Sequence, residues 1–371
     1  MQNKHLKDLE DILNELSENF EQAMDCFDRR YKKLAKSISE DEIQTVKPRT
    51  SIQVVALNTL FVGILFNNNQ YKDIIQYVDE NLKDILQGHK RSYDGFAAKI
   101  IKNYYASRRM CKLDSSMLFA LLVPNKEKGN EETVSVLTNC ILDMLIQNKI
   151  YMRLENNITT TGEQAKYNYY NGIIEMVEMN YKKALELFHH ANILSKNKNL
   201  TGTIEKHIIM CMLLQSDFNI PYSFSKKLKV YFELVNTVKS ADLSSFEHVL
   251  EKYREDLMRD DLYFIAQRLA QNVVQEGIRK IALVYSRISY VDISKTLNME
   301  EEDVDFILRK TINQGLVRGK VEDRVFYSLK NTKDVQDINI NIKDGLYLTK
   351  YIREQMKYPK IEPLCYEKIS K

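Results

Sequence analysis

The 371-residue sequence contains little glycine and proline and no tryptophan: 11 Gly, 5 Pro and 0 Trp. Glycine and proline interrupt regular structure, so their scarcity favours helices joined by short loops over a sheet-rich fold with many turns. Hydrophobic residues make up 44% and charged residues 28% of the chain, which is ordinary for a soluble globular protein. The length allows two or three domains.

Cysteine is also sparse, and no two cysteines form a CxxC pair. This spacing predicts buried thiols in a reducing compartment rather than disulfides or metal ligands. The N-terminus, MQNKHLKDLE, has no apolar signal core, and no stretch approaches the length of a membrane span. We therefore expect a protein of the cytoplasm, the nucleus or both, without membrane contact. The cysteines are Cys26, Cys111, Cys140, Cys211 and Cys365.

An excess of either charge is absent, because 54 basic residues face 51 acidic ones for a formal net charge of +3. This near-balance gives no global attraction to nucleic acid or to anionic membranes. The sequence also has no GxxxxGK[ST] or HExxH motif, and His189 and His190 would point to different faces of one helix. We expect no metal, no cofactor and no enzymatic activity, although a triad assembled from distant residues stays open.

An apolar stripe marks the N-terminal region, residues 1–50. Leu6, Leu9, Leu13, Leu16 and Phe20 alternate steps of three and four, and Phe27 continues the pattern. This predicts one long amphipathic helix, packed either on its own chain or on a partner helix. Polar residues and Pro48 then mark a boundary.

Residues 51–160 read as a helical-repeat solenoid, because helical stretches alternate with short polar joints. Further helical repeats are predicted over 161–260. There, five residues have the spacing of a tetratricopeptide repeat, in which small side chains let two helices approach closely. The five residues are Gly172, Tyr181, Ala184, Phe188 and Ala191.

A winged helix is predicted over residues 261–330. A long helix over 262–285, bent at Gly277, precedes two expected capping boxes, Ser289 with Asp292 and Asn298 with Glu301. LVRGKV and VFYSL then flank a tight turn as two strands. Core contacts of the long helix are expected from Ile265, Leu269, Val273, Ile281 and Val284.

The outline of a helix-turn-helix raises the question of DNA binding. Residues 300–305, EEEDVD, carry five carboxylates where a recognition helix would meet phosphate, so the sequence argues against nucleic acid. The wing, with Arg318, Lys320 and Arg324 among acidic residues, has mixed charge. We instead predict an assembly element whose sheet edge pairs with a neighbouring protein. Its candidate residues are Ser286, Arg287, Ile288, Val317, Val321, Val325 and Tyr327.

The last segment, residues 336–371, is expected to begin as a polar linker and to end in a short assembly helix. Leu348, Tyr351, Ile352 and Met356 lie on one side of that helix, and Pro359 would end it. A short helix is marginal alone, so we expect it to dock on its own winged helix or on a neighbour's helices.

A solenoid that runs directly into a winged helix is similar to the PCI domain, here residues 161–335. RLAQNVVQEGIRKIALVYSRIS, FELVNTVKSADLSSFEHVLEKY and the KYP after the last helix resemble one family in particular. This is the family of the third non-ATPase regulatory subunit of the 26S proteasome lid. The resemblance covers roughly residues 165–360, and the chain looks shorter than is usual in the family.

The resemblance implies a mainly α-helical, non-catalytic scaffold for ubiquitin-dependent protein degradation. It also implies partners: other lid subunits, met through winged-helix contacts and a C-terminal helical bundle, and a small, acidic, largely disordered lid subunit. Alternatives are a scaffold subunit of the signalosome or of a translation initiation factor, a winged-helix protein that binds nucleic acid, and an enzyme of unrecognised type.

Overall fold

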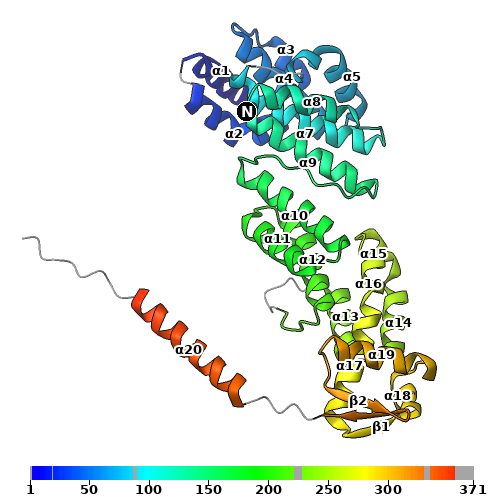
Figure 1. Ribbon diagram of the computed structural model, residues 1–371. Coiled ribbons are helices and arrows are strands. Elements are labelled where there is room, and N and C mark those ends of the chain that lie inside the picture. Colours follow the sequence, from blue (N-terminus) through cyan, green and yellow to red (C-terminus); the bar gives the residue numbers. More distant parts are fainter. Residues whose placement is uncertain (1, 19, 87–89, 221–227, 330–334, 356–371) are drawn as a thin grey trace, which may run out of the picture. The chain divides into compact units, whose positions relative to one another are not determined.

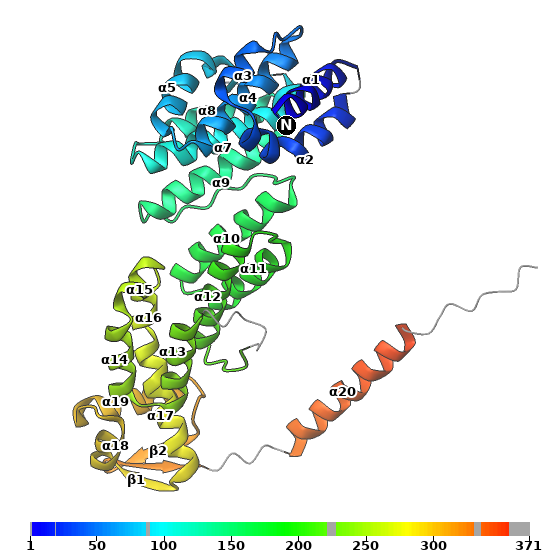
Figure 2. The ribbon, with the colours of Figure 1, turned by 180° about the vertical axis from the view of Figure 1, so that it is seen from behind.

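The computed structural model describes all residues except 1, 19, 87–89, 221–227, 330–334 and 356–371. Contacts divide the chain into two compact units. The helical unit comprises Met1–Asn236 and His248–Asn272, and the winged-helix unit comprises Thr237–Glu247 and Val273–Lys371. Figures 1 and 2 follow the elements from two opposite sides. The boundaries predicted at residues 50, 160, 260 and 335 stay predictions.

The chain is mainly helical, and the predicted fold class, a helical-repeat solenoid followed by a winged helix, is confirmed. Most helices of the helical unit contact the next one along the chain, as in stacked hairpins. Its elements are α1 (Gln2–Glu18), α2 (Phe20–Ser37), α3 (Glu40–Thr45), α4 (Ser51–Asn67), α5 (Tyr71–Asn81), α6 (Lys83–Leu86), η1 (Arg91–Tyr93), α7 (Asp94–Met110), α8 (Met117–Glu127), α9 (Glu131–Gln147), α10 (Thr161–Val177), α11 (Tyr181–Leu194), α12 (Lys198–Leu214), α15 (Arg254–Arg259) and α16 (Tyr263–Gln267). Three helices have residues in both units: α13 (Lys229–Ser240), α14 (Leu243–Lys252) and α17 (Leu269–Val284).

The turns between helices are built largely without glycine. After α4, Asn69 takes a left-handed conformation (φ 61°), and the N–H of Gln70 donates to the carbonyl of Leu65 at 3.0 Å. After α10, Met179 (φ 68°) plays the same part, and the N–H of Asn180 donates to the carbonyl of Glu175 at 2.9 Å. In both turns the left-handed residue lets a following N–H bond to a carbonyl that the helix leaves unpaired. Short turns can therefore recur in a glycine-poor chain.

The N-terminal stripe forms two helices rather than the predicted single one. α1 and α2 contact each other, and both contact α4. Leu9, Leu13, Leu16 and Phe27 are buried in a core that they share with residues of α4. Folding the stripe back on itself lets both halves bury their apolar side against the same neighbour. The stripe therefore packs within its own chain.

The repeat predicted from small residues is confirmed by the packing of α10 on α11. A Cβ at Gly172 would lie 2.6 Å from Cε1 of Phe188, so only glycine allows this approach of the two helices. Ala184, Phe188 and Ala191 are fully buried in the same region. Tyr181 begins α11, as Tyr71 begins α5.

The winged-helix unit contains a small sheet and two short helices beside the end of α17. Its elements are β1 (Arg287–Ser289), α18 (Tyr290–Leu297), α19 (Glu301–Asn313), β2 (Gly319–Glu322), β3 (Val325–Ser328) and α20 (Val335–Gln355). The sheet is antiparallel with the order β1-β3-β2, so β1 adds a strand to the predicted hairpin. Phe326, Ile293 and Leu308 lie at the centre of the core.

Several details of the predicted winged helix are wrong. The long helix breaks at Arg268 rather than bending at Gly277, which α17 contains. Gly277 instead makes room for Leu297, whose Cδ2 would lie 2.4 Å from an added Cβ. Asn298 does not begin the second helix. It ends α18 in a left-handed conformation (φ 54°), which asparagine tolerates well, and Glu300 is the residue before α19.

The helix α20 begins at Val335 and is described to Gln355, so the residues from 336 on that were predicted as a polar linker are helical. Met356 and the predicted stop at Pro359 lie outside the described residues. Among the helices in the described part of the chain, none is both long and apolar enough to cross a membrane.

Candidate assembly interface

The first predicted feature of the interface is the edge of the sheet at β1. The N–H of Ser328 donates to the carbonyl of Ser286, and the N–H of Tyr290 donates to the carbonyl of Arg324, each at 3.0 Å. Because successive residues of a strand turn their backbone groups to opposite sides, Arg287 directs its N–H and C=O away from β3. Ser286 faces β3, so the backbone edge that β1 offers to a neighbour is short.

The opposite edge, at β2, is longer. The N–H of Leu329 donates to the carbonyl of Arg318 at 3.0 Å, which places the backbone of Arg318 and of every second residue after it toward β3. Gly319 and Val321 therefore turn their backbone groups outward. Among the described residues no backbone group pairs with them, and the edge at β2 is open to strand pairing.

Four of the predicted interface residues are either buried or on the central strand of the sheet. Ile288 and Val317 are buried in the core of the winged-helix unit, although Val317 also borders a surface hollow. Val325 and Tyr327 belong to β3, which is paired on both sides and has no free backbone edge. What they offer is the solvent face of the sheet.

That solvent face places a tyrosine between two cations. The guanidinium of Arg287 lies 5.6 Å and the Nζ of Lys320 lies 5.7 Å from the centroid of the Tyr327 ring. Lys320 also pairs with Glu322 at 3.0 Å, which offsets part of the positive charge. The face is therefore amphipathic rather than strongly basic.

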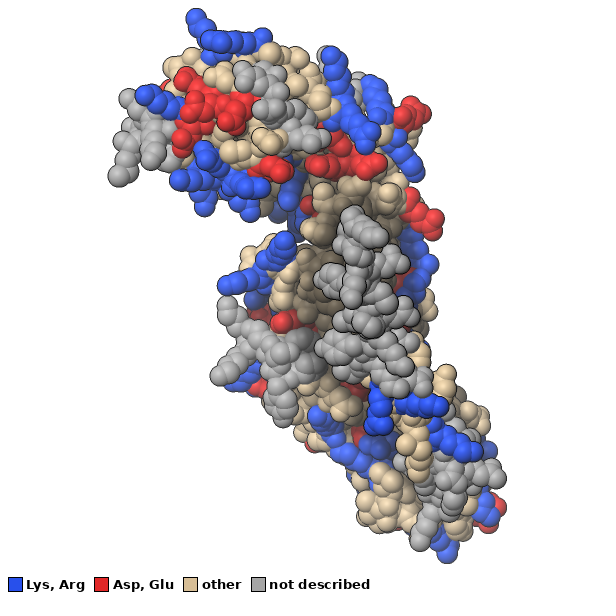
Figure 3. Space-filling view, turned by 90° about the vertical axis from the view of Figure 1, so that its left-hand side faces the viewer, with Lys and Arg blue, Asp and Glu red and all other residues tan. Residues whose placement is uncertain are grey.

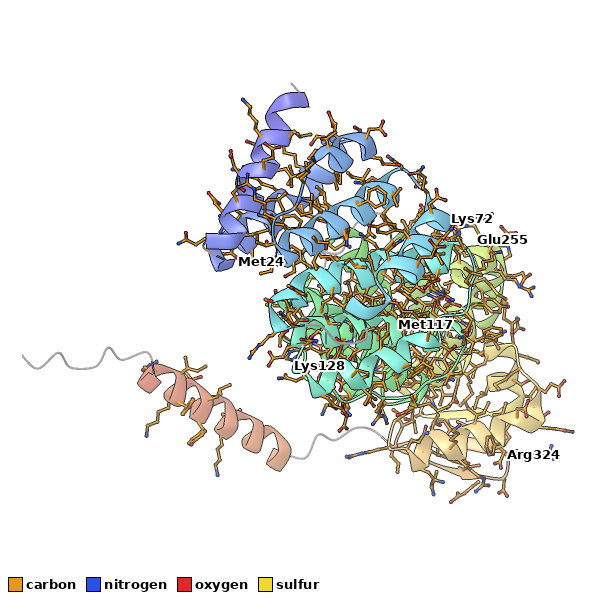
Figure 4. The ribbon with its side chains drawn as sticks, turned by 90° about the horizontal axis from the view of Figure 1, so that it is seen from above. Met24, Lys72, Met117, Lys128, Glu255 and Arg324 are labelled. Atoms are coloured by element: carbon orange, nitrogen blue, oxygen red, sulfur yellow. The ribbon has the colours of Figure 1, made fainter. Side chains whose placement is uncertain are left out.

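The first turn of α19 remains acidic in the folded chain. Asp305 accepts hydrogen bonds from Nε of Arg309 at 2.8 Å and from the hydroxyl of Tyr290 at 2.6 Å, and these donors lower the pKa of its carboxyl. Glu301 pairs with Arg324 at 3.4 Å. Figure 4 labels Arg324 in the winged-helix unit. A phosphate would meet repulsion at this helix start.

The most conspicuous surface of the winged-helix unit lies where α17 ends beside β2 and β3, and sequence reasoning missed it. Five large apolar side chains, between 46% and 74% exposed, line one hollow of about 620 Å³ together with Ser286 and Val317. We call this group the end patch. Its residues are Leu283, Val284, Tyr285, Leu316 and Leu329.

The end patch is held in place by hydrogen bonds of Ser328. The Ser328 hydroxyl donates to the carbonyl of Ala282 at 2.7 Å, and its N–H donates to the carbonyl of Ser286. Arg279, at the rim, forms two hydrogen bonds with the carboxylate of Glu276 at 2.8 and 2.6 Å. An exposed apolar group on a fixed frame is typical of a protein–protein contact.

The prediction that Val284 is a core residue is therefore wrong. Ile265, Leu269, Val273 and Ile281 are buried as expected, but Val284 is the most exposed member of the end patch. The helical spacing of Val284 fits the core stripe, and the reason it is exposed is that α17 ends there. Two features of the sequence could have indicated the patch. One is the apolar run LVY, which ends one residue before β1, and the other is the pair of apolar residues at the outer ends of the predicted hairpin.

The helix α20 carries the remaining predicted interface residues. Leu348, Tyr351 and Ile352 have the spacing of one helix side, and all three are exposed. Ile342 and Leu346, which the sequence reading did not select, are exposed as well. Nothing in the described part of the chain covers these side chains.

The described residues do not form a metal site: no group of three or more His, Cys, Asp or Glu side chains among them could hold an ion. Cys140 and Cys211 are buried, and burial raises the pKa of both thiols to about 12. A thiol with such a pKa is a poor nucleophile at neutral pH.

Comparison with known proteins agrees with this architecture. Residues 1–235 match the PSMD3-like N-terminal TPR repeats, and residues 250–326 match the PCI domain. The chain is 49% identical to 26S proteasome regulatory subunit RPN3 of Encephalitozoon cuniculi, over 98% of this chain and 97% of that protein.

Relatives from other organisms are longer. The chain is 25% identical to 26S proteasome non-ATPase regulatory subunit 3 of Dictyostelium discoideum over 70% of this chain, but only 56% of that protein is covered. With RPN3 of Saccharomyces cerevisiae the identity is 27% over 67% of this chain and 52% of the yeast protein. The predicted family is confirmed: the chain belongs to the RPN3, or non-ATPase regulatory subunit 3, family of the 26S proteasome.

Proposed function

We propose that this regulatory subunit of the 26S proteasome acts as a non-catalytic scaffold, which its winged-helix unit joins to neighbouring lid subunits. The observation that carries the proposal is the end patch: five large apolar side chains exposed around one hollow on a hydrogen-bonded frame. Fully burying a Leu or Val side chain stabilises an association by about 1.5–3 kcal/mol. The patch can therefore supply the apolar centre of an interface.

Two further surfaces are proposed to act with the end patch. The open backbone edge of β2, at Gly319 and Val321, can accept a strand from a neighbour. The exposed side of α20, with Leu348, Tyr351 and Ile352, suits a bundle of helices from several subunits. A small, acidic, disordered subunit remains an expected partner, and the cytoplasm and nucleus remain the expected compartments.

The comparisons favour this function over the alternatives. The relatives named above are all described as 26S proteasome regulatory subunits. The acidic residues at the start of α19 argue against binding of nucleic acid by this helix.

Substitution in the end patch tests the proposal. We expect Leu283→Lys to reduce incorporation of the chain into a lid that is co-expressed from its subunits, because it places a charge in an apolar contact. Phe306→Lys is the matched control, since Phe306 is 67% exposed and Leu283 is 69% exposed, and both lie on helices of the same unit. Equal incorporation of the two variants would contradict the proposed role of the patch.

A further inference from the structure

A groove in the helical unit has features that the scaffold function of the winged-helix unit does not use. It lies beside α4 and α5, where the start of α3 also contributes, and has a volume of about 300 Å³. We call it the acidic groove. Its lining residues are Glu40, Phe61, Leu65, Gln70, Asp73, Gln76, Tyr77 and Glu80.

The floor of the acidic groove is apolar and fixed. The rings of Phe61 and Tyr77 meet edge to face with their centroids 4.9 Å apart. The hydroxyl of Tyr77 donates to Oδ1 of Asn58 on α4 at 3.0 Å, so the ring is held at both ends. Leu65 lies beneath, buried in the core of the unit. A partner would meet a preformed aromatic surface.

The rim of the groove carries negative charge without a cation. Glu40, Asp73 and Glu80 form no ion pair with any described Lys or Arg, although such pairs are frequent elsewhere in the described chain. The hydrogen bonds that these residues do receive come from neutral amides: Asn68 donates to Glu40 and Gln76 donates to Glu80, each at 3.0 Å. The three negative charges are therefore available to a partner.

The stability of α5 does not explain why a carboxylate stands at Glu80. Asp73 lies in the first turn of α5, where the helix dipole favours a carboxylate. Glu80 lies in the last turn, where the same dipole disfavours one and no basic residue is present. A cation from outside the chain would relieve this unfavourable placement.

Gln70 adds a second sign of an incomplete site. Its Oε1 is shielded from solvent, but it has no hydrogen-bond donor among the described residues. A shielded acceptor without a partner costs about 1–3 kcal/mol. The groove thus combines carboxylates and an unsatisfied acceptor above an apolar floor, and it offers no cationic side chain.

We propose that the acidic groove binds a basic amphipathic helix of a partner protein. Asp73 and Glu80 are seven residues apart on α5, which is two helical turns or roughly 10 Å. A helix lying along α5 meets both carboxylates when its Lys or Arg residues are also seven positions apart. Apolar residues between them, three or four positions on, would then rest on Phe61 and Tyr77.

Binding of a designed peptide to the full chain tests the proposal. The probe is a labelled 15-residue alanine-based helix with two Lys seven positions apart and two Leu between them, measured by fluorescence anisotropy. We expect saturable binding that is lost when the two Lys are replaced by Glu. No binding of the Lys peptide, or equal binding of both peptides, would overturn the proposal.

Variants of the groove distinguish specific from general attraction. The double variant Asp73→Asn with Glu80→Gln keeps the shape of both side chains and should weaken binding about tenfold, as expected for the loss of two ion pairs of about 0.7 kcal/mol each. Glu127→Gln, at an exposed residue that ends α8, is the control and should leave the affinity unchanged. An equal loss in the control would mean non-specific charge attraction and would refute the groove.

Carbodiimide cross-linking of the purified native complex identifies the partner's chemistry directly, because this reagent joins a carboxylate only to an amine in contact with it. Trypsin releases residues 73–83 as one peptide. We expect this peptide to be linked, through Asp73 or Glu80, to a Lys of another subunit. Recovery only as the unlinked peptide, or linkage to a second copy of this chain, would contradict the proposal. Neither result would affect the role of the end patch.

Discussion

The close packing of α10 on α11 makes a prediction with an unusual sign. Replacing glycine by alanine inside a helix normally stabilises it, by about 0.5–1 kcal/mol. At Gly172, however, the new Cβ would lie 2.6, 2.8 and 3.0 Å from three atoms of the Phe188 ring. That ring is fully buried beside Tyr169 and His207 and cannot retreat.

Overpacking of this kind costs about 1–3 kcal/mol, so the net effect of Gly172→Ala lies between about zero and about 2.5 kcal/mol. The middle of that range is a destabilisation of about 1–2 kcal/mol. Gly202 provides the matched control. It also lies inside a helix, α12, but an added Cβ there has no atom within 4 Å. Gly202→Ala should therefore stabilise the helical unit by about 0.5–1 kcal/mol.

Native-state hydrogen exchange is the suitable assay, because a chain of this size need not unfold in one step. Amides of α10 and α11 should exchange roughly 5–30 times faster in Gly172→Ala, and those of α12 more slowly in Gly202→Ala. If both variants slow exchange, Phe188 has room to move, and the reasoning on the repeat is refuted.

Two further predictions concern a buried histidine and a helix cap. Burial lowers the pKa of His207 to about 4 from its usual 6.5, and its Nδ1 lies 2.8 Å from the carbonyl of Thr203. Between pH 6.5 and pH 4 the unfolded chain therefore binds a proton on His207 that the folded chain does not bind. The free energy of unfolding should fall by roughly 3 kcal/mol as the pH drops through this range. An NMR titration of His207 in the folded chain with a midpoint above about pH 6 would contradict this. At the start of α18 the side chain of Ser289 accepts a hydrogen bond from the N–H of Asp292 at 3.3 Å. Ser289→Ala should therefore cost about 1 kcal/mol and speed hydrogen exchange in α18 by about fivefold. Unchanged exchange would show that the cap is not needed.

Spacing and capping rules predicted much of the fold because both act locally. Gly172, Ala184 and Phe188 define the α10–α11 pair in sequence and in structure alike. Ser289 caps α18 as the sequence indicates. In these cases the neighbours that decide the conformation lie within one helix or one hairpin.

Where the prediction failed, a distant contact decides the structure. The N-terminal stripe divides into α1 and α2 because α4, far along the chain, offers one surface for both. Gly277 admits Leu297 of another element. Asn298 is an exception, since its N–H donates to the carbonyl of Ser294 in the helix that it ends. Strand β1 exists through pairing with β3, some 40 residues later. Local patterns do not contain such information.

The end patch was not predicted from the sequence, and the interface role of the residues that the sequence did indicate stays a prediction. Ser286 and Val317 do border the hollow at the end of α17. The exposed side chains there include Leu283, Val284 and Leu329, and of these the periodicity assigns Val284 to the core. Exposure depends on where a helix stops and on what covers its end, and the sequence does not state either.

The most direct test of the account is hydroxyl-radical footprinting of the end patch in the free chain and in the assembled lid. In the free chain, Leu283, Val284, Tyr285 and Leu329 should all be oxidised readily, because they are exposed. If the patch joins this subunit to its neighbours, assembly should protect these residues, while Phe306 remains reactive. Oxidation of the patch to the same extent in both states would contradict the central claim.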